Sequence, residues 1–509
     1  MKNQLKAGAV LSYAALFINS AISIIYTPIM LSLLGQSEYG LYSLASATSG
    51  FIGVLNFGLG NALIRYSAKY KALNDEQGCS KLYGLFFIIY GVLGGIALVA
   101  GIILTLNADL FFSNSLSIAE LHTLKIIMRI MIVNISIGIG LGMFSVIILA
   151  HEKFVFQKTV VIISSIISPL LILPFLIMGY GVITMALIIT LLNFITIIIN
   201  IYFCIKKIKI KIIFKKLEKG LFKEIIIFSF YIFLNLIISQ LYWSTDQVIL
   251  GIYSGTIAVS IYTIGVSFTG YFSGFSSAIS NVFLSKVSTM VTQEATDQEL
   301  SELFIRIGRV QYIIISFALS GFVVFGQEFI YLWVGLEYSE SYIIAVIILA
   351  PMLVSLIQSM GGVILQAKNM QKFKSVINIF VAIVNVIMSV IFVQWWGVIG
   401  CAIATAISFT IGNIVIINIY YWKKISINIP EFWVNILSLS TPLIISLLYG
   451  FTLNGEIIAN YWTLLFIKIF VFSLVYIFII WITGMNNYEK DLIIVPVKRI
   501  TRRLRGNHA

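Results

Sequence analysis

Apolar windows of about 20 residues, long enough to cross the hydrocarbon core of a bilayer as a helix, follow one another along almost the whole chain. Of the 509 residues, 60% are hydrophobic and 10% are charged, whereas soluble domains carry about 25% charged residues. Few segments remain that could form a soluble domain. The sequence therefore predicts an all-α polytopic membrane protein. The first apolar run, from about Ala7 to Leu34, is longer than a signal-peptide core and lacks a cleavage pattern, so we expect it to remain as the first span.

Polar breaks between the apolar windows divide the chain into fourteen candidate transmembrane helices. We expect them near residues 7–34, 39–65, 82–106, 124–149, 159–178, 181–205, 225–250, 257–283, 304–330, 342–366, 375–395, 397–421, 431–453 and 460–484.

The distribution of Lys and Arg predicts the orientation of these spans, because cations near span ends stay on the cytoplasmic side. One side of the predicted topology collects 30 of the 33 Lys and Arg residues, and the exceptions are Lys125, Arg129 and Lys468. We therefore expect a multi-pass protein of the bacterial cytoplasmic (inner) membrane with both termini cytoplasmic. The net charge of +13 follows from this topology and from anionic lipid on the inner leaflet, so nucleic acid is not expected as a partner.

Short stretches in the two halves of the chain match at a nearly constant separation. At an offset of 216, Gly181 matches Gly397 and Lys158 matches Lys374, and at an offset of 220 Asn61 matches Asn281. The matches predict a duplication of a six-helix unit. Since six is even, the two copies have the same orientation and should enclose a central cavity, as in transporters with parallel repeats.

The duplication predicts a division of the chain into bundles, linker and tail. We expect a six-helix bundle over 1–205, a Lys-rich cytoplasmic linker over 206–224, a second bundle over 225–424, two additional transmembrane helices over 425–485, and a basic cytoplasmic tail over 486–509.

The spacing of Cys and His residues indicates neither a disulfide framework nor a metal site. The three cysteines are far apart and form no CxxC pair, and none of the three histidines has a partner at ligand spacing. No metal and no cofactor are expected.

Charges inside apolar spans are candidates for function, because an ion in hydrocarbon is costly and is usually kept for a task. Arg129 lies about one turn into the fourth span, where snorkelling to the interface and a role in the cavity are both open. Asp246 lies late in the seventh span, where it could pair with a cation, bind a coupling ion or cap the outer boundary. Lys125 and Lys468 fit snorkelling or packing roles.

One further cation lies at the end of the second helix of each predicted bundle. Arg65 lies in the last turn of the second span, and Lys286 is one position beyond its counterpart in the second half. Each could anchor a helix end in water, and their near-symmetry about the predicted cavity makes attraction of an anion such as phosphate an equally open role. Pro28, well inside the first span, could be a hinge or a static kink.

A familiar pattern surrounds Arg65. The stretch "TPIMLSLLGQSEYGLYSLASATSGFIGVLNFGLGNALIRY", residues 27–66, resembles the start of the bacterial polysaccharide and O-antigen flippases of the multidrug/oligosaccharidyl-lipid/polysaccharide exporter superfamily. In that family "LG..EYG.Y" precedes a "GLG.A..R" helix end, and "GVIGCAIAT" at 397–405 looks like its twelfth helix. Two bundles of six helices plus two extra helices is similar to the family's layout.

The resemblance implies a function and a site. A flippase of this family would move an undecaprenyl-diphosphate-linked oligosaccharide, an O-antigen or related surface polysaccharide unit of the kind used in lipopolysaccharide biosynthesis, to the outer leaflet by alternating access. Arg65 would then be a cavity cation, while Arg129 and Lys286 are nominated from their charge and position alone. Besides the cargo, membrane lipids, a polysaccharide polymerase and chain-length proteins are the expected partners.

Two other functions are alternatives to the flippase. A drug or cation antiporter of the same superfamily needs buried carboxylates, for which Asp246 is the main candidate. A membrane glycosyltransferase or polysaccharide polymerase needs acids or bases on sizeable outer loops, yet the longest outer segment, about 107–123, carries no paired carboxylates of that kind. We therefore expect a transporter and not an enzyme.

Overall fold

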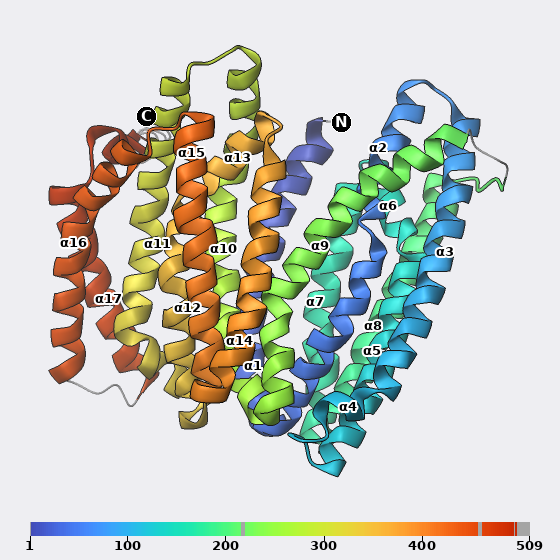
Figure 1. The fold of residues 1–509 in the computed structure, drawn as a ribbon, viewed down its shortest axis with the longest axis horizontal. Coiled ribbons are helices and arrows are strands. Elements are labelled where there is room, and N and C mark those ends of the chain that lie inside the picture. The colour runs from blue at the N-terminus through green and yellow to red at the C-terminus, as the bar shows by residue number, and fades with distance from the viewer. Residues whose placement is uncertain (1, 215–218, 457–460, 493, 496–509) are drawn as a thin grey trace, which may run out of the picture. The chain divides into compact units, whose positions relative to one another are not determined.

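A computed structural model of the chain describes residues 2–214, 219–456, 461–492 and 494–495, and the regular structure within these ranges is helical throughout (Figure 1). Most of the basic tail predicted at 486–509 and part of the Lys-rich linker lie outside the described residues. The first half contains α1 Lys2–Gly53, α2 Leu59–Ala72, α3 Glu76–Leu106, α4 Ala108–Phe112, α5 Ile118–Leu141, α6 Met143–Ala150, α7 Phe154–Ile177 and α8 Val182–Tyr202. The second half contains α9 Lys219–Tyr253, α10 Gly255–Thr292, α11 Asp297–Val334, α12 Glu340–Ile357, α13 Ser359–Ala367, α14 Gln371–Phe409, α15 Ile417–Ile425, α16 Ile429–Glu456 and α17 Trp462–Ile479.

The described helices confirm the predicted fold class and the fourteen spans. Twelve stretches are long and apolar enough to cross a membrane. Two of them, α1 with α2 and α14 with α15, are each long enough for two crossings and contain a glycine with non-helical backbone, Gly35 (φ 76°) and Gly397 (φ 54°). Because only glycine adopts such angles at little cost, these residues reverse the chain between consecutive spans.

The second span, predicted as one helix over 39–65, is broken. Helix α1 ends at Gly53, a short 3₁₀ turn covers Val54–Asn56, and α2 begins after two left-handed residues, Phe57 (φ 53°) and Gly58 (φ 62°). Tertiary contacts hold the break: Phe57 stacks on Phe233 of α9 with ring centroids 4.1 Å apart, and a Cβ at Gly58 would overlap Ile232. Apolar periodicity does not report such a break, because Val54, Leu55 and Phe57 within it are themselves apolar.

The spans predicted at 124–149 and 342–366 are also each formed by two helices. The first is divided at Gly142, between α5 and α6, and the second at Gln358, between α12 and α13. The two breaks are 216 residues apart, which is the offset of the sequence repeat.

Residues with a positive φ recur with the repeat as well. Gly35 (φ 76°) and Gly255 (φ 82°) are 220 residues apart, and so are Asn74 (φ 54°) and Glu294 (φ 56°). The same chain reversals therefore occur at corresponding places in the two halves, which supports the duplication. The break before α2 has no counterpart, since α10 is continuous from Gly255 to Thr292.

The chain divides into two compact units, residues 1–264 with 382–404, and residues 265–381 with 405–509. In the first unit, α3 packs on α5, α5 packs on α8, and α7 also packs on α8 (Figure 1). A core cluster of this unit joins α2, α3 and α6 around the fully buried Leu63, Phe86 and Met143.

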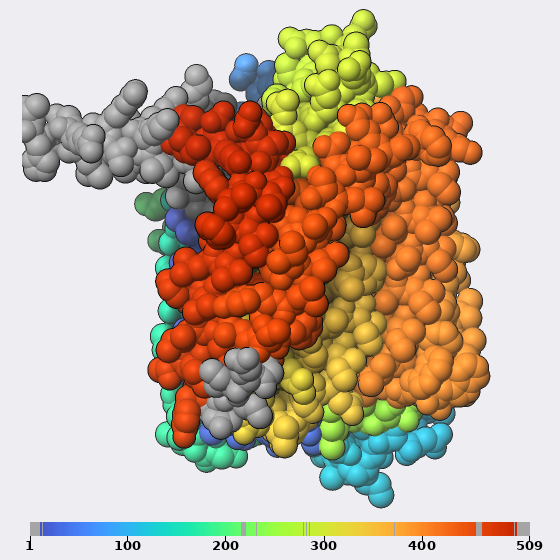
Figure 2. Space-filling model, turned by 90° about the vertical axis from the view of Figure 1, so that its left-hand side faces the viewer, coloured from blue at the N-terminus to red at the C-terminus, as the bar shows by residue number. Residues whose placement is uncertain are grey.

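In the second unit, α16 and α17 pack on α11. The face on which these two helices lie is seen in Figure 2 (red). Large apolar side chains are exposed there, and they include Val434, Leu448, Phe470 and Phe478. Such a surface is expected of helices in contact with lipid tails.

Candidate functional site

Arg65 lies in the middle of α2, on the side of the helix that is not packed in the core. Its side chain is exposed, and its guanidinium carbon lies 4.9 Å from the ring centroid of Phe228 and 5.9 Å from that of Tyr66. Within the described ranges it forms no ion pair. Two aromatic rings therefore orient a guanidinium whose N–H groups remain available to a ligand.

The neighbourhood of Arg65 is built from α2 and α9. Tyr66 is buried, and its hydroxyl donates to Glu224 Oε2 at 3.2 Å. Glu224 lies one turn before Phe228 on α9. The contacts of Tyr66 and Phe228 thus position Arg65 from two helices, and only the tertiary structure brings these residues together.

The other two predicted cavity cations are also exposed. Arg129 lies on α5 and Lys286 on α10, and the described part of the chain provides neither with an ion-pair partner. Lys125, one turn from Arg129, differs, because its ammonium binds Asp109 at 2.5 Å.

Asp246, on α9, is buried, with 1% of its surface exposed. Its Oδ2 accepts a hydrogen bond from the Tyr262 hydroxyl at 2.5 Å, and its Oδ1 accepts one from Ser389 at 2.6 Å. Hydroxyl donors on both oxygens stabilise the carboxylate in an apolar span. The arrangement places Asp246 inside the bundle and not at its surface.

Pro28, the proposed hinge, lies within α1, and the one residue of that helix with non-helical backbone angles is Gly35. Proline cannot donate a backbone hydrogen bond, so the turn around Pro28 is held by fewer hydrogen bonds than the rest of the helix.

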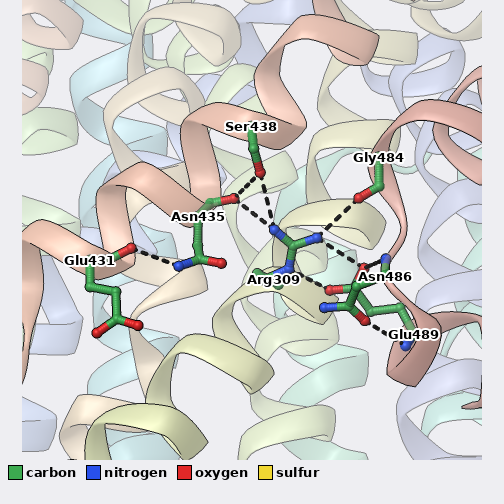
Figure 3. A network of polar contacts seen from close by, with 7 residues as sticks. All are labelled: Arg309, Glu431, Asn435, Ser438, Gly484, Asn486 and Glu489. Atoms are coloured by element: carbon green, nitrogen blue, oxygen red, sulfur yellow. Dashed lines mark hydrogen bonds and ion pairs between the residues drawn. The ribbon is translucent and has the colours of Figure 1, made fainter.

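Arg309 is a buried cation that sequence reasoning counted only as a residue of the cytoplasmic side. It lies in α11 with 6% of its surface exposed, and its guanidinium is the centre of the network in Figure 3. Its Nε and Nη2 donate to the two oxygens of Glu489 at 2.6 and 3.1 Å. The remaining N–H groups donate to Asn435 O, Ser438 Oγ and Gly484 O.

This network fixes the additional helices to α11, because its acceptors lie in α16 and in the segment after α17. No sequence signal could have found it, since Arg309 and Glu489 are 180 residues apart.

Lys468 of α17 is a second buried cation. Its ammonium binds both oxygens of Glu328 in α11, at 2.9 and 3.1 Å, and also Asn454 at 2.9 Å. Lys468 therefore connects α17 with α11 and α16 within the second unit.

Comparison with known proteins identifies the family. The model of a family described as "Polysaccharide biosynthesis protein" matches residues 5–284, more than half of the chain. The "Probable low-salt glycan biosynthesis flippase Agl15" of Haloferax volcanii is 27% identical over 232 residues. That alignment covers 45% of this chain and 48% of the relative, so the chain matches about half the length of that protein.

Two solved structures share the fold. "Lipid II flippase MurJ, inward closed conformation" superposes with a TM-score of 0.74 at 19% identity, over 95% of this chain and 100% of that one. An inward-facing multidrug resistance MATE family transporter of the MOP superfamily gives a TM-score of 0.63 at 15% identity, over 80% of this chain and 98% of that one. The helices described above thus form the fold of these transporters, and the match over residues 5–284 shows that the chain belongs to the polysaccharide biosynthesis protein family.

Proposed function

We propose that this protein is a flippase that moves a lipid-linked oligosaccharide from one leaflet of its membrane to the other, and that it catalyses no covalent chemistry. The observation that carries the proposal is the family match over residues 5–284. The relative from Haloferax volcanii is named a glycan biosynthesis flippase, and the protein with the same fold over 95% of this chain is named a lipid II flippase. Polar sugars do not cross hydrocarbon unaided, so this step requires a protein.

The proposed cargo is an undecaprenyl-diphosphate-linked repeat unit of O-antigen or a related surface polysaccharide. Arg65, with N–H groups free of an ion pair in the described ranges, suits the oxygens of a diphosphate. Arg129 and Lys286 are proposed as further cations for the same group, since both are exposed on membrane helices.

The proposed movement is alternating access in the bacterial cytoplasmic membrane, with both termini on the cytoplasmic side. Pro28 is proposed as a hinge of the first span, because it weakens α1 well inside its length. A polysaccharide polymerase would use the delivered units, so this enzyme and chain-length proteins are proposed as partners.

Deletion of the gene tests the function directly. We expect surface polysaccharide to disappear while lipid-linked repeat units accumulate on the inner leaflet, and we expect a plasmid copy to restore both. Unchanged surface polysaccharide together with altered drug tolerance would contradict the proposal and favour the drug antiporter.

Asp246 is proposed as the group that couples transport to a proton or a monovalent cation. An Asp246→Asn variant keeps the shape of the side chain but not its charge, so export should fall roughly tenfold and lose its dependence on the ion gradient. The measurement is export in cells with the proton or the sodium gradient collapsed. Asp109→Asn, which changes an exposed carboxylate, is the control. Full, gradient-dependent export by Asp246→Asn would refute this role.

A further inference from the structure

Two adjoining cavities lie inside the first unit. A cavity of about 400 Å³ lies among α5, α6, α7 and α8, and a smaller one of about 140 Å³ lies among α1, α5 and α8. Asn134 and Ile135 line both, so the two are neighbours, and we name them together the polar cleft. The larger cavity is within the range of about 300–1,000 Å³ that is usual for small-molecule sites.

The polar side chains that line the polar cleft are uncharged. Amides and hydroxyls are interspersed with apolar residues such as Met131, Ile135 and Leu141, and no described Lys, Arg, Asp or Glu lines either cavity. The polar members are Tyr42, Ser46, Ser49, Asn134, Ser145, Gln157, Thr190, Asn193, Thr196 and Asn200. Such a lining offers nothing to neutralise a diphosphate or a cationic drug, but it can exchange hydrogen bonds with a neutral, hydroxyl-rich molecule.

Three oxygens in the polar cleft have no hydrogen-bond partner among the described residues. They are Ser49 Oγ, Gln157 Oε1 and Asn200 Oδ1. Ser49 and Asn200 are themselves buried, with 0% and 4% of their surface exposed. An unsatisfied buried oxygen costs about 1–3 kcal/mol, so these positions call for a ligand or water that donates hydrogen bonds. Sugar hydroxyls donate, whereas phosphate oxygens do not.

The duplicated half shows that the fold does not require this polarity. At the repeat offset of 216, apolar residues occupy the positions that correspond to several polar cleft residues of α5, α7 and α8. Asn134 corresponds to Ala350, Gln157 to Phe373, Thr190 to Ala406 and Asn193 to Phe409. The same helices can therefore be built without amides, which are expensive in a membrane unless they face water or a ligand.

Gly138 of α5 leaves room in the larger cavity. A Cβ at this position would meet no heavy atom within 4 Å, and the corresponding residue in the second half is Val354. The glycine is thus not needed for close helix packing.

We infer that the polar cleft is a binding path for the saccharide part of the cargo, separate from the cations that hold the diphosphate. Its residues on α8 extend from Ala186 to Asn200, about 21 Å along the helix, which is most of the thickness of the hydrocarbon core. A sugar chain could therefore stay hydrogen-bonded during most of its passage. This inference rests on the proposed flippase function.

The test compares two lipids bound to the purified full-length protein in nanodiscs. One probe is the lipid-linked oligosaccharide that accumulates in cells lacking the gene, and the other is sugar-free undecaprenyl diphosphate. The wild type should bind the sugar-bearing lipid roughly tenfold more tightly, as expected for a few net hydrogen bonds. Gly138→Leu, which fills the larger cavity, and Asn193→Leu, which removes an exposed amide, should abolish this preference and leave affinity for undecaprenyl diphosphate unchanged.

Gly95→Leu is the matched control. This glycine is also helical, in α3, and an added Cβ would meet no heavy atom within 4 Å, but Gly95 lines neither cavity. It should keep the wild-type preference. If Gly138→Leu and Asn193→Leu discriminate the two lipids as the wild type does, the saccharide path is refuted while the flippase function stands. If no lipid-linked oligosaccharide accumulates without the gene, the function itself fails and the inference falls with it.

Discussion

Replacement of Glu489 by alanine is expected to lower the stability of the protein by about 3–5 kcal/mol, because it leaves a buried guanidinium without its counter-ion. Arg309 would keep its bonds to Asn435, Ser438 and Gly484, but these acceptors carry no charge. Thermal unfolding of the purified protein in detergent, followed by intrinsic fluorescence, measures the loss as a lowered Tm.

The control for this prediction is another arginine on the same helix. Arg306 lies one turn from Arg309 but is exposed, and its guanidinium carbon stacks 4.6 Å from the Tyr488 ring centroid. Arg306→Leu should therefore cost at most about 1 kcal/mol.

A double variant separates the charge from the packing. When Arg309 and Glu489 are both replaced by leucine, no buried charge remains unpaired, so much of the stability lost in Glu489→Ala should return. A Glu489→Ala protein with the wild-type Tm would contradict the role of this ion pair in holding the segment after α17 to α11.

Export by an Arg65→Ala variant is expected to fall about 10- to 100-fold, because one charge-assisted bond to phosphate contributes about 1.5–3 kcal/mol. Arg65→Lys keeps the charge but loses the planar guanidinium that the two aromatic rings orient. Its export should therefore lie between that of the wild type and that of Arg65→Ala. Both variants are compared with the wild type by surface polysaccharide at equal protein levels in the deletion strain.

Lys69→Ala is the matched control for Arg65. Lys69 is exposed one turn further along α2, and the positive-inside distribution accounts for it without a ligand. Its replacement should leave export unchanged. If Arg65→Ala and Arg65→Lys both restore full export, Arg65 is a helix anchor and its assignment to the cargo is wrong.

The fold class and the number of spans were predictable from local information. Hydrophobic windows report membrane spans directly, since each helix must satisfy its own backbone hydrogen bonds in lipid. The family was predictable too, because its motif around Gly35 and Arg65 is contiguous in the chain. The roles proposed for Arg65, Arg129, Lys286, Asp246 and Pro28 remain predictions.

The breaks inside the predicted spans were not predictable in the same way. Val54–Gly58 is as apolar as its flanks, and its left-handed turn is held by Phe233 and Ile232 of a helix about 175 residues further along the chain. Hydrophobic periodicity predicts which face of a helix is buried. It carries no information on the tertiary contacts that break a helix.

The sequence by itself determined that the chain crosses a membrane many times, that it is duplicated and which family it resembles. Hydropathy, the repeat offset and the family motif all follow from the order of residues along the chain. Only the tertiary structure decided which polar side chains have partners. It paired Arg309 with Glu489 and Lys468 with Glu328, and it left Ser49, Gln157 and Asn200 of the polar cleft with oxygens that no described residue pairs. The cost of burying a polar group depends on its neighbours in space, and those neighbours are distant in the chain.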